Sequence, residues 1–310
     1  MAEKQDTSTP AATVHETERV APPAEPVPPE LTPFQENWTR LRQNKAAIAG
    51  LVIIALFILT AVFAPMLAPA DPVAQNIQIR KSAPLTGNGI LGTDDLGRHL
   101  LSRIMYGARL SMPIGIVSVG IAMIGGVALG TVSGYYGGLF DRLVMRFIDI
   151  MLAFPYVLLT IVIVAVLGPS LTNAMIAIGI SQMPRYVRLV RASVLAEKEA
   201  DYVLAERSLG TGDFELMFGS ILPNSLAPVI VQATLGVGEA ILSSAALSFL
   251  GLGAQPPTPE WGLMIASSRE FVTSAWWIVT FPGIATLLAV LGFNLFGDGL
   301  RDVLDPRMKD

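Results

Sequence analysis

Few side chains in this sequence are able to carry out catalysis, and they are scattered. Cys is absent, and the only two histidines, His15 and His99, lie far apart. Thiol nucleophiles and Cys-ligated zinc are therefore excluded. None of the five lysines follows a glycine, so the phosphate-binding motif G-x-x-x-x-G-K-[ST] does not occur, and neither do H-E-x-x-H or G-x-S-x-G. We predict a chain that is not an enzyme, holds no metal or cofactor, and does not bind ATP itself.

One carboxylate stands inside a long apolar run. Glu239 lies within residues 225–250, followed closely by Ser243 and Ser244. Ionisable groups inside a membrane often mark a substrate pathway, so these three residues are candidates for lining one. The alternative is a glutamate hydrogen-bonded to a neighbouring serine or to backbone. The sequence shows no paired intramembrane charges and no internal repeat, which argues against an ion-coupled carrier working alone.

The composition indicates that these residues belong to a membrane protein. Hydrophobic residues make up 52% of the chain and charged residues 15%, against roughly 25% charged in a typical soluble domain. The net charge is −4 and no basic patch is present, so nucleic acid is not an expected partner. We expect a multi-pass protein of the cell (inner) membrane, in contact with lipid.

Six charge-poor runs are long enough to cross a bilayer, which takes about 20 apolar residues. They cover 46–64, 111–134, 143–167, 171–190, 225–250 and 277–296. The sequence therefore predicts an all-α polytopic fold with six transmembrane helices. Pro65 is expected to end the first. Glycines recur in the second and fifth runs and are expected to permit close helix packing rather than to bind substrate: Gly115, Gly120, Gly125, Gly126, Gly130, Gly236 and Gly238.

The distribution of Lys and Arg favours both termini on the cytoplasmic side, N-in and C-in. Residues 1–33 are Pro-rich and predict a disordered cytoplasmic tail. Residues 34–70 predict an amphipathic segment, with a simple linker as the alternative, followed by the first span. Residues 71–110 are expected to form an extracytoplasmic loop, although they contain more Lys and Arg than the positive-inside rule favours on that side. Residues 111–300 form the core, and 301–310 a cytoplasmic C-terminus.

The polar stretch 199–224 interrupts the apolar runs on the cytoplasmic side. Its sequence predicts a helix, a stop at Gly210, and a second helix with Asp213 as N-cap. Phe214, Met217 and Phe218 form an apolar ridge on that second helix. Such a ridge suits docking into a groove of a partner. Packing against the chain's own bundle explains it equally well.

This stretch resembles the cytoplasmic coupling loop, or EAA motif, of ABC importer permeases. The consensus is Glu-Ala-Ala, three residues, Gly, nine residues, Ile, one residue, Leu-Pro. Ala205, Gly210 and Leu222-Pro223 match it. The chain departs from it at the consensus Glu, second Ala and Ile positions, which are occupied by Leu204, Glu206 and Ser220.

Three further stretches are similar to the C-type permeases of dipeptide, oligopeptide and nickel ABC importers. They are residues 91–109, beginning LGTDDLGR; residues 247–262, with LSFLGLG and QPPTP; and residues 294–307, with GDGLRD and LDPR. The resemblance covers about residues 34 to 310. It implies a type I importer fold, a heterodimer with a homologous B-type permease, two ATPase subunits that bind ATP and Mg, and an extracytoplasmic binding protein.

By the same resemblance, the 199–224 loop would receive motion from an ATPase. The residues expected to form this coupling loop are Asp201, Tyr202, Ala205, Glu206, Arg207, Gly210, Asp213, Phe214, Leu222 and Pro223. The substrate is most simply a di- or oligopeptide, while nickel chelates, glutathione and opines stay open as alternatives.

Two extracytoplasmic features have structural interpretations. Residues 256–261, with three prolines and Trp261, predict a stiff segment, with gating or contact to a binding protein as the alternative. Trp276 and Trp277 suit an aromatic belt. Residues 93–98 are expected to cap a helix and are given no substrate role.

Overall fold

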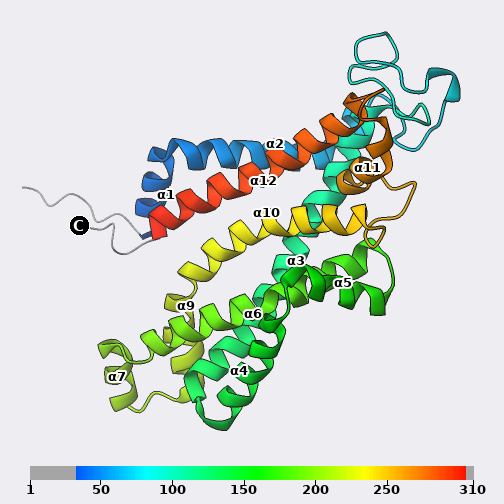
Figure 1. Cartoon of the computed structure of the whole chain (residues 1–310). Coiled ribbons are helices and arrows are strands. Elements are labelled where there is room, and N and C mark those ends of the chain that lie inside the picture. The colour runs from blue at the N-terminus through cyan, green and yellow to red at the C-terminus, as the bar shows by residue number, and fades with distance from the viewer. Residues whose placement is uncertain (1–32, 305–310) are drawn as a thin grey trace, which may run out of the picture.

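The computed structural model describes residues 33–304, which form a helical protein (Figure 1). Within these residues the only β contact is an isolated antiparallel bridge between Thr93 and His99. The predicted all-α fold is confirmed. The predicted tail, apart from Pro33, and the last six residues of the C-terminus lie outside the described range.

The helices are as follows. The longer ones are α1 (Pro33–Gln43), α2 (Lys45–Leu67), α3 (Leu100–Tyr136), α4 (Gly138–Ala153), α5 (Tyr156–Leu167), α6 (Leu171–Glu197), α10 (Ala227–Phe249) and α12 (Trp277–Leu304). The shorter ones are α7 (Asp201–Ser208), α8 (Asp213–Glu215), α9 (Leu222–Ser225) and α11 (Trp261–Ser268). Two 3₁₀ turns, Ile77–Ile79 and Arg269–Phe271, and a π turn, Leu216–Ile221, complete the described secondary structure.

Within residues 33–304, four helices are long and apolar enough to span a membrane: α2, α3, α10 and α12. The bent pair α4 and α5 makes at most a fifth. The expected third span, 143–167, is not one helix, because the chain bends by 97° between α4 and α5. Pro155 explains the break, since a residue before proline is pushed out of the helical region, and Phe154 is extended at φ −88° and ψ 138°.

Several helices run beyond the apolar stretches that predicted them. α3 begins at Leu100, well before 111, and α6 and α12 continue past their predicted ends. Pro65 does not end α2, which continues to Leu67. A proline this close to the end of a helix removes one hydrogen bond and leaves the last turn intact, so the predicted stop was wrong.

The glycines of α3 allow it to pack closely along α6. A methyl group on Gly126 would lie 2.3 Å from Cβ of Tyr186, and one on Gly130 would lie 2.8 Å from the Val187 carbonyl oxygen. Gly115 similarly abuts Val237 on α10. The predicted packing role is confirmed at these positions. At Gly120 it stays a prediction, because no described residue of this chain lies within 4 Å of a methyl group added there.

The N-terminal segment is a helix, not a linker. Leu41 on α1 is buried against Ala47 and Val303, so α1 is held by α2 and the end of α12. Asn44 caps α2 and also donates a 3.0 Å hydrogen bond to Asp302. Figure 1 shows α1, the end of α12 and α7 at one end of the molecule, with the loop before α3 and helix α11 at the other.

Candidate functional site

The expected coupling loop begins with α7 and turns at Gly210. The backbone N–H of Gly210 donates to the Arg207 carbonyl at 3.0 Å, and that of Thr211 donates to the Glu206 carbonyl at 3.2 Å. This pair of bonds is a Schellman motif, which requires a residue with positive φ, and Gly210 has φ +88°. The predicted helix stop is confirmed.

The second half of the loop is wound differently from the prediction. Asp213 is not an N-cap: it is the first residue of α8, and Gly212 is the capping residue. The Asp213 carboxylate instead accepts a 2.6 Å hydrogen bond from the Tyr135 hydroxyl, at the end of α3. The chain then forms a π turn over Leu216–Ile221 and enters α9, with Pro223 in its first turn.

The predicted apolar ridge divides between two environments. Met217 is 4% exposed and packs into the bundle, whereas Phe214 is 74% exposed and Phe218 43% exposed. The two phenylalanine rings lie against each other with centroids 4.7 Å apart. Packing against the bundle is therefore confirmed for Met217, while docking into a partner stays a prediction for Phe214 and Phe218.

Two departures from the EAA consensus contact each other. Ser220 donates a 2.6 Å hydrogen bond to the Glu206 carboxylate, which joins the two halves of the loop. The consensus has the apolar residues Ala and Ile at these positions, where this chain has a hydrogen-bonded polar pair. Sequence comparison treats the two departures separately, and the fold shows that they form a pair.

Further bonds attach the loop to the bundle. Tyr202 donates to Glu197 at 2.7 Å and accepts from Asn224 at 3.1 Å. Partial burial, together with the hydrogen bond to Glu197, raises the pKa of the Tyr202 hydroxyl, so it stays a neutral donor. Lys198 donates to the Tyr135 carbonyl at 2.7 Å. Of the remaining expected residues, Leu222 is half-buried and four are exposed: Asp201, Ala205, Arg207 and Pro223.

The candidate path residue Glu239 is ion-paired. One Arg185 nitrogen, Nη1, donates to both Glu239 carboxylate oxygens, at 2.9 and 2.8 Å. The alternative of a side chain bonded only to serine or backbone is wrong. Ser243 bonds the Glu239 carbonyl at 2.8 Å and receives a hydrogen bond from Tyr156 at 3.0 Å. Ser244 is buried, and its hydroxyl has no partner among the described residues.

Two more arginines of α6 pair with acids of α4. Arg188 lies 2.6 Å from Asp149, and Arg191 lies 2.5 Å from Asp141. These ion pairs were not predicted from the sequence. The partners are 39 and 50 residues apart in sequence, so only the packing of α4 on α6 reveals them.

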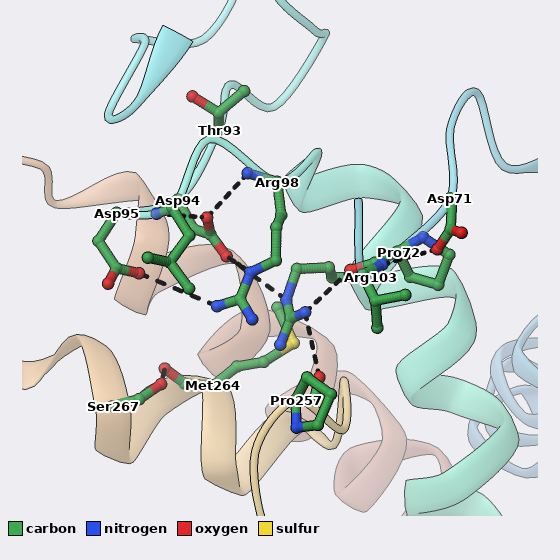
Figure 2. A network of polar contacts seen from close by, with 12 residues as sticks. Asp71, Pro72, Thr93, Asp94, Asp95, Arg98, Arg103, Pro257, Met264 and Ser267 are labelled. Carbon is green, nitrogen blue, oxygen red and sulfur yellow. Dashed lines mark hydrogen bonds and ion pairs between the residues drawn. The ribbon is translucent and has the colours of Figure 1, made fainter. Parts of the chain in front are cut away.

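A buried ionic network holds the loop before α3 in place (Figure 2). Asp94 accepts from the backbone of Leu96 and Arg98 and pairs with the Arg98 guanidinium at 2.6 Å. Arg103 lies 3.6 Å from the same carboxylate and donates to the carbonyls of Pro72 and Pro257. The predicted capping role is wrong, because His99 is the N-cap of α3 and makes no side-chain cap bond.

The proline-rich segment leads into α11. Trp261 is 1% exposed and donates to the Ile104 carbonyl at 3.0 Å. Glu260, not singled out from the sequence, caps α11 by accepting from the backbone of Gly262 and Leu263. Its burial raises its pKa. Of the two tryptophans expected in an aromatic belt, Trp276 is exposed but its neighbour Trp277 is buried.

Within residues 33–304 no group of three His, Cys, Asp or Glu side chains is placed to hold a metal. The candidate site therefore consists of the loop 199–224 and the ion pairs that α6 makes with α4 and α10.

Comparisons with known proteins agree with this architecture. Residues 126–310 match the family model described as binding-protein-dependent transport system inner membrane component. Residues 32–84 match the N-terminal TM domain of oligopeptide transport permease C. The chain resembles a MetNI methionine ABC transporter structure in an inward-facing conformation, with a TM-score of 0.54 at 16% identity, covering 66% of this chain and 98% of that one. That likeness shows the fold.

Curated relatives match over nearly the whole chain. A dipeptide transport system permease protein of Alkalihalophilus pseudofirmus is 52% identical, over 93% of this chain and 95% of its own length. A di/tripeptide transport system permease protein of Pseudomonas aeruginosa is 50% identical, over 94% and 97%. With a family model that matches more than half of its residues and relatives this similar, the chain belongs to the binding-protein-dependent transport system inner membrane component family.

Proposed function

We propose that this chain is the C-type permease subunit of an ATP-driven importer of di- or oligopeptides. It forms the translocation path with a homologous B-type permease. Two ATPase subunits, which bind ATP and Mg, act on it from the cytoplasm, and an extracytoplasmic binding protein delivers the cargo. The names of the relatives, which refer to dipeptides and tripeptides, favour peptides over nickel. Family membership disfavours an ion-coupled carrier working alone.

The coupling role rests on the exposed side chains of Phe214 and Phe218, which lie on a turn that is packed against the bundle. Their rings contact each other at a tilt of 45°, while Leu216 and Ile221, from the same turns, are buried in the bundle. An exposed aromatic pair on a fixed helical turn is the kind of anchor that fills a pocket in a partner. We assign loop 199–224 as the part that docks on an ATPase.

We propose six spans with both termini in the cytoplasm. In this arrangement the bent pair α4 and α5 is the third span and α6, whose arginines lower its apolar character, is the fourth. Ion pairing with α4 and α10 offsets the cost of those charges. The grouping of α1, the end of α12 and α7 at one end of the molecule supports this topology (Figure 1). Glu239, Ser243 and Ser244 are proposed to face the path.

Co-purification and uptake test the function. The tagged chain, co-expressed with the neighbouring permease and ATPase genes, should retain the ATPases. Reconstituted with the binding protein, it should import labelled alanyl-alanine on ATP addition. Phe214→Ala together with Phe218→Ala should reduce ATPase retention by about tenfold or more, since such anchors dominate interfaces.

The matched control is Leu85→Ala, because Leu85 is 82% exposed but lies in the extracytoplasmic loop. It should retain the ATPases as the unaltered chain does. Full ATPase retention by the double variant would contradict the docking role. Uptake of nickel with no uptake of alanyl-alanine would favour the alternative substrate.

A further inference from the structure

The Arg185–Glu239 pair is placed differently from a purely structural ion pair. Arg185 lies near the middle of α6 and Glu239 near the middle of α10, and their side chains are 44% and 38% exposed. Both charged groups are therefore accessible at mid-span from outside this chain's own bundle. Charged residues at such depth usually face a bundle interior or a polar pathway, where they mark the route of a substrate.

The Arg185 guanidinium has unused bonding capacity. Only its Nη1 contacts Glu239, and within residues 33–304 no protein acceptor is found for its Nε or Nη2. An arginine presents five N–H donors in a planar fork that matches a carboxylate. A second carboxylate can thus approach the guanidinium before the first has left.

The surroundings of the pair are polar and fixed. Tyr156, at the bend between α4 and α5, lies with its ring 5.6 Å from the Arg185 guanidinium. Its hydroxyl bonds Ser243 at 3.0 Å and receives a hydrogen bond from Gln182 at 3.4 Å. Gln182 is 1% exposed, and its side-chain oxygen has no hydrogen-bond partner among the described residues. A buried acceptor of this kind calls for a donor such as an N–H group.

From these contacts we infer that Arg185, Glu239 and Tyr156 form a subsite for the two charged ends of a zwitterionic peptide. The cargo carboxylate pairs with Arg185 and the cargo ammonium with Glu239, beside the face of Tyr156. Two new ion pairs replace the internal one, so no charge is left unpaired in a low-dielectric span, which would be costly. A peptide that is blocked at both ends has no charged groups to pair with Arg185 and Glu239, so the ion pair between these two residues stays closed. The site then selects for free termini.

Because this assignment rests on the proposed peptide import, its test separates the two. The four-subunit complex is held in nanodiscs without the binding protein, so that any selection among peptides is made by the translocation path. The probe is alanyl-photo-leucine, a dipeptide with a photoreactive side chain, and adducts are mapped by mass spectrometry. Adducts are expected on α5, α6 and α10, and excess alanyl-alanine should suppress them. The same probe acetylated at its N-terminus and amidated at its C-terminus should not label these helices.

Arg185→Gln and Glu239→Gln should each reduce labelling by about tenfold, because each removes the ion pair to one end of the peptide, and the bound peptide shields that ion pair from water. Arg185→Lys, which keeps the charge, should recover part of it. Arg188→Gln is the matched control, since Arg188 is on the same helix and also pairs with an acid, Asp149. It should change labelling less than about twofold, as exposed pairs contribute little. Assembly of each variant is checked by size-exclusion chromatography.

Uptake of alanyl-alanine by the unaltered importer, measured in parallel, tests the peptide function itself. If uptake occurs but labelling of α5, α6 and α10 is absent, or is the same for the capped probe, the subsite assignment is wrong. Unchanged labelling in Arg185→Gln would overturn it as well. Absence of dipeptide uptake by the unaltered importer would instead refute the proposed substrate.

Discussion

The Tyr135 hydroxyl donates a 2.6 Å hydrogen bond to the Asp213 carboxylate, joining the last turn of α3 to the second half of the loop 199–224. Lys198 holds the same tyrosine from the other side of the loop by donating to its carbonyl at 2.7 Å. α3 also packs closely on α6 through Gly126 and Gly130. In the proposed coupling, a displacement of the loop would pass to α3 through this hydrogen bond.

Tyr135→Phe should weaken this transmission. The variant keeps the ring and loses only the hydroxyl that binds a charged acceptor, a contact contributing about 1.5–3 kcal/mol when desolvated. Peptide uptake per ATP hydrolysed, measured in proteoliposomes with the binding protein, should fall several-fold while ATP hydrolysis continues. Tyr136→Phe is the control, because Tyr136 is adjacent and 56% exposed. Equal uptake per ATP in both variants would show that this bond does not carry coupling.

The turn at Gly210 should be sensitive to backbone conformation alone. Gly210 has φ +88°, and nothing lies within 4 Å of an added methyl group. Gly210→Ala therefore causes no clash, but the left-handed backbone conformation destabilises an alanine by about 1–2 kcal/mol relative to glycine. Amide hydrogen exchange across α7 should accelerate accordingly.

Gly212→Ala provides the comparison, two residues away. Gly212 has φ −70°, which any residue adopts, and its surroundings are equally open. An alanine there should leave exchange unchanged or slow it slightly, since it restricts the unfolded chain. Equal acceleration in the two variants would refute the conformational explanation.

The sequence predicted the local features of this loop better than its contacts. Gly210 was identified because a helix end with positive φ requires glycine, which is a local rule. Asp213 was assigned as an N-cap by the same kind of rule, but a tyrosine 78 residues away in sequence takes its carboxylate. The π turn over Leu216–Ile221, in which Leu216 and Ile221 are buried, has no distinct sequence pattern.

For the charged residues inside the bundle, too, the sequence predicted local features better than contacts. Glu239 was noticed because it interrupts an apolar run, whereas Arg185 was not singled out. Nothing in their sequence spacing indicates that they pair across 54 residues. Only the packing of α6 and α10 brings them together. The bend at Pro155 was also missed, because apolar content predicts a span without indicating whether its helix is continuous.

Asp94→Asn should loosen the loop between α2 and α3. The Asp94 side chain is 4% exposed and faces Arg98 and Arg103, so its neutralisation leaves two buried cations with reduced compensation (Figure 2). Breaking a buried ion pair by removing one partner costs about 3–5 kcal/mol. Limited proteolysis should then cleave the loop between α2 and α3 much faster.

Asp95→Asn is the matched control for this network. Asp95 is 31% exposed and approaches Arg98 only to 4.0 Å, so its loss should cost less than about 1 kcal/mol. Equal proteolysis rates for the Asp94 and Asp95 variants would mean that the network does not hold the loop.

Glu260 gives a pH dependence with a definite sign. It is 2% exposed and accepts hydrogen bonds from Ser248 and from the backbone of Gly262 and Leu263. Burial nevertheless raises its pKa above that of a free glutamate, because the charged form loses hydration. The folded chain therefore keeps this proton to a higher pH than the unfolded chain does.

From this shift we predict that Glu260 reduces stability as pH rises. Above the ordinary pKa of glutamate the unfolded state binds fewer protons than the folded state, so the free energy of unfolding falls with pH until the folded-state pKa is passed. Thermal unfolding of the detergent-solubilised chain between about pH 4 and pH 8 measures this slope. Glu260→Gln does not titrate, and although it loses one cap acceptor, its slope should be flatter. The difference between the two slopes cancels the contributions of the other acids, so parallel curves would rule out a raised Glu260 pKa.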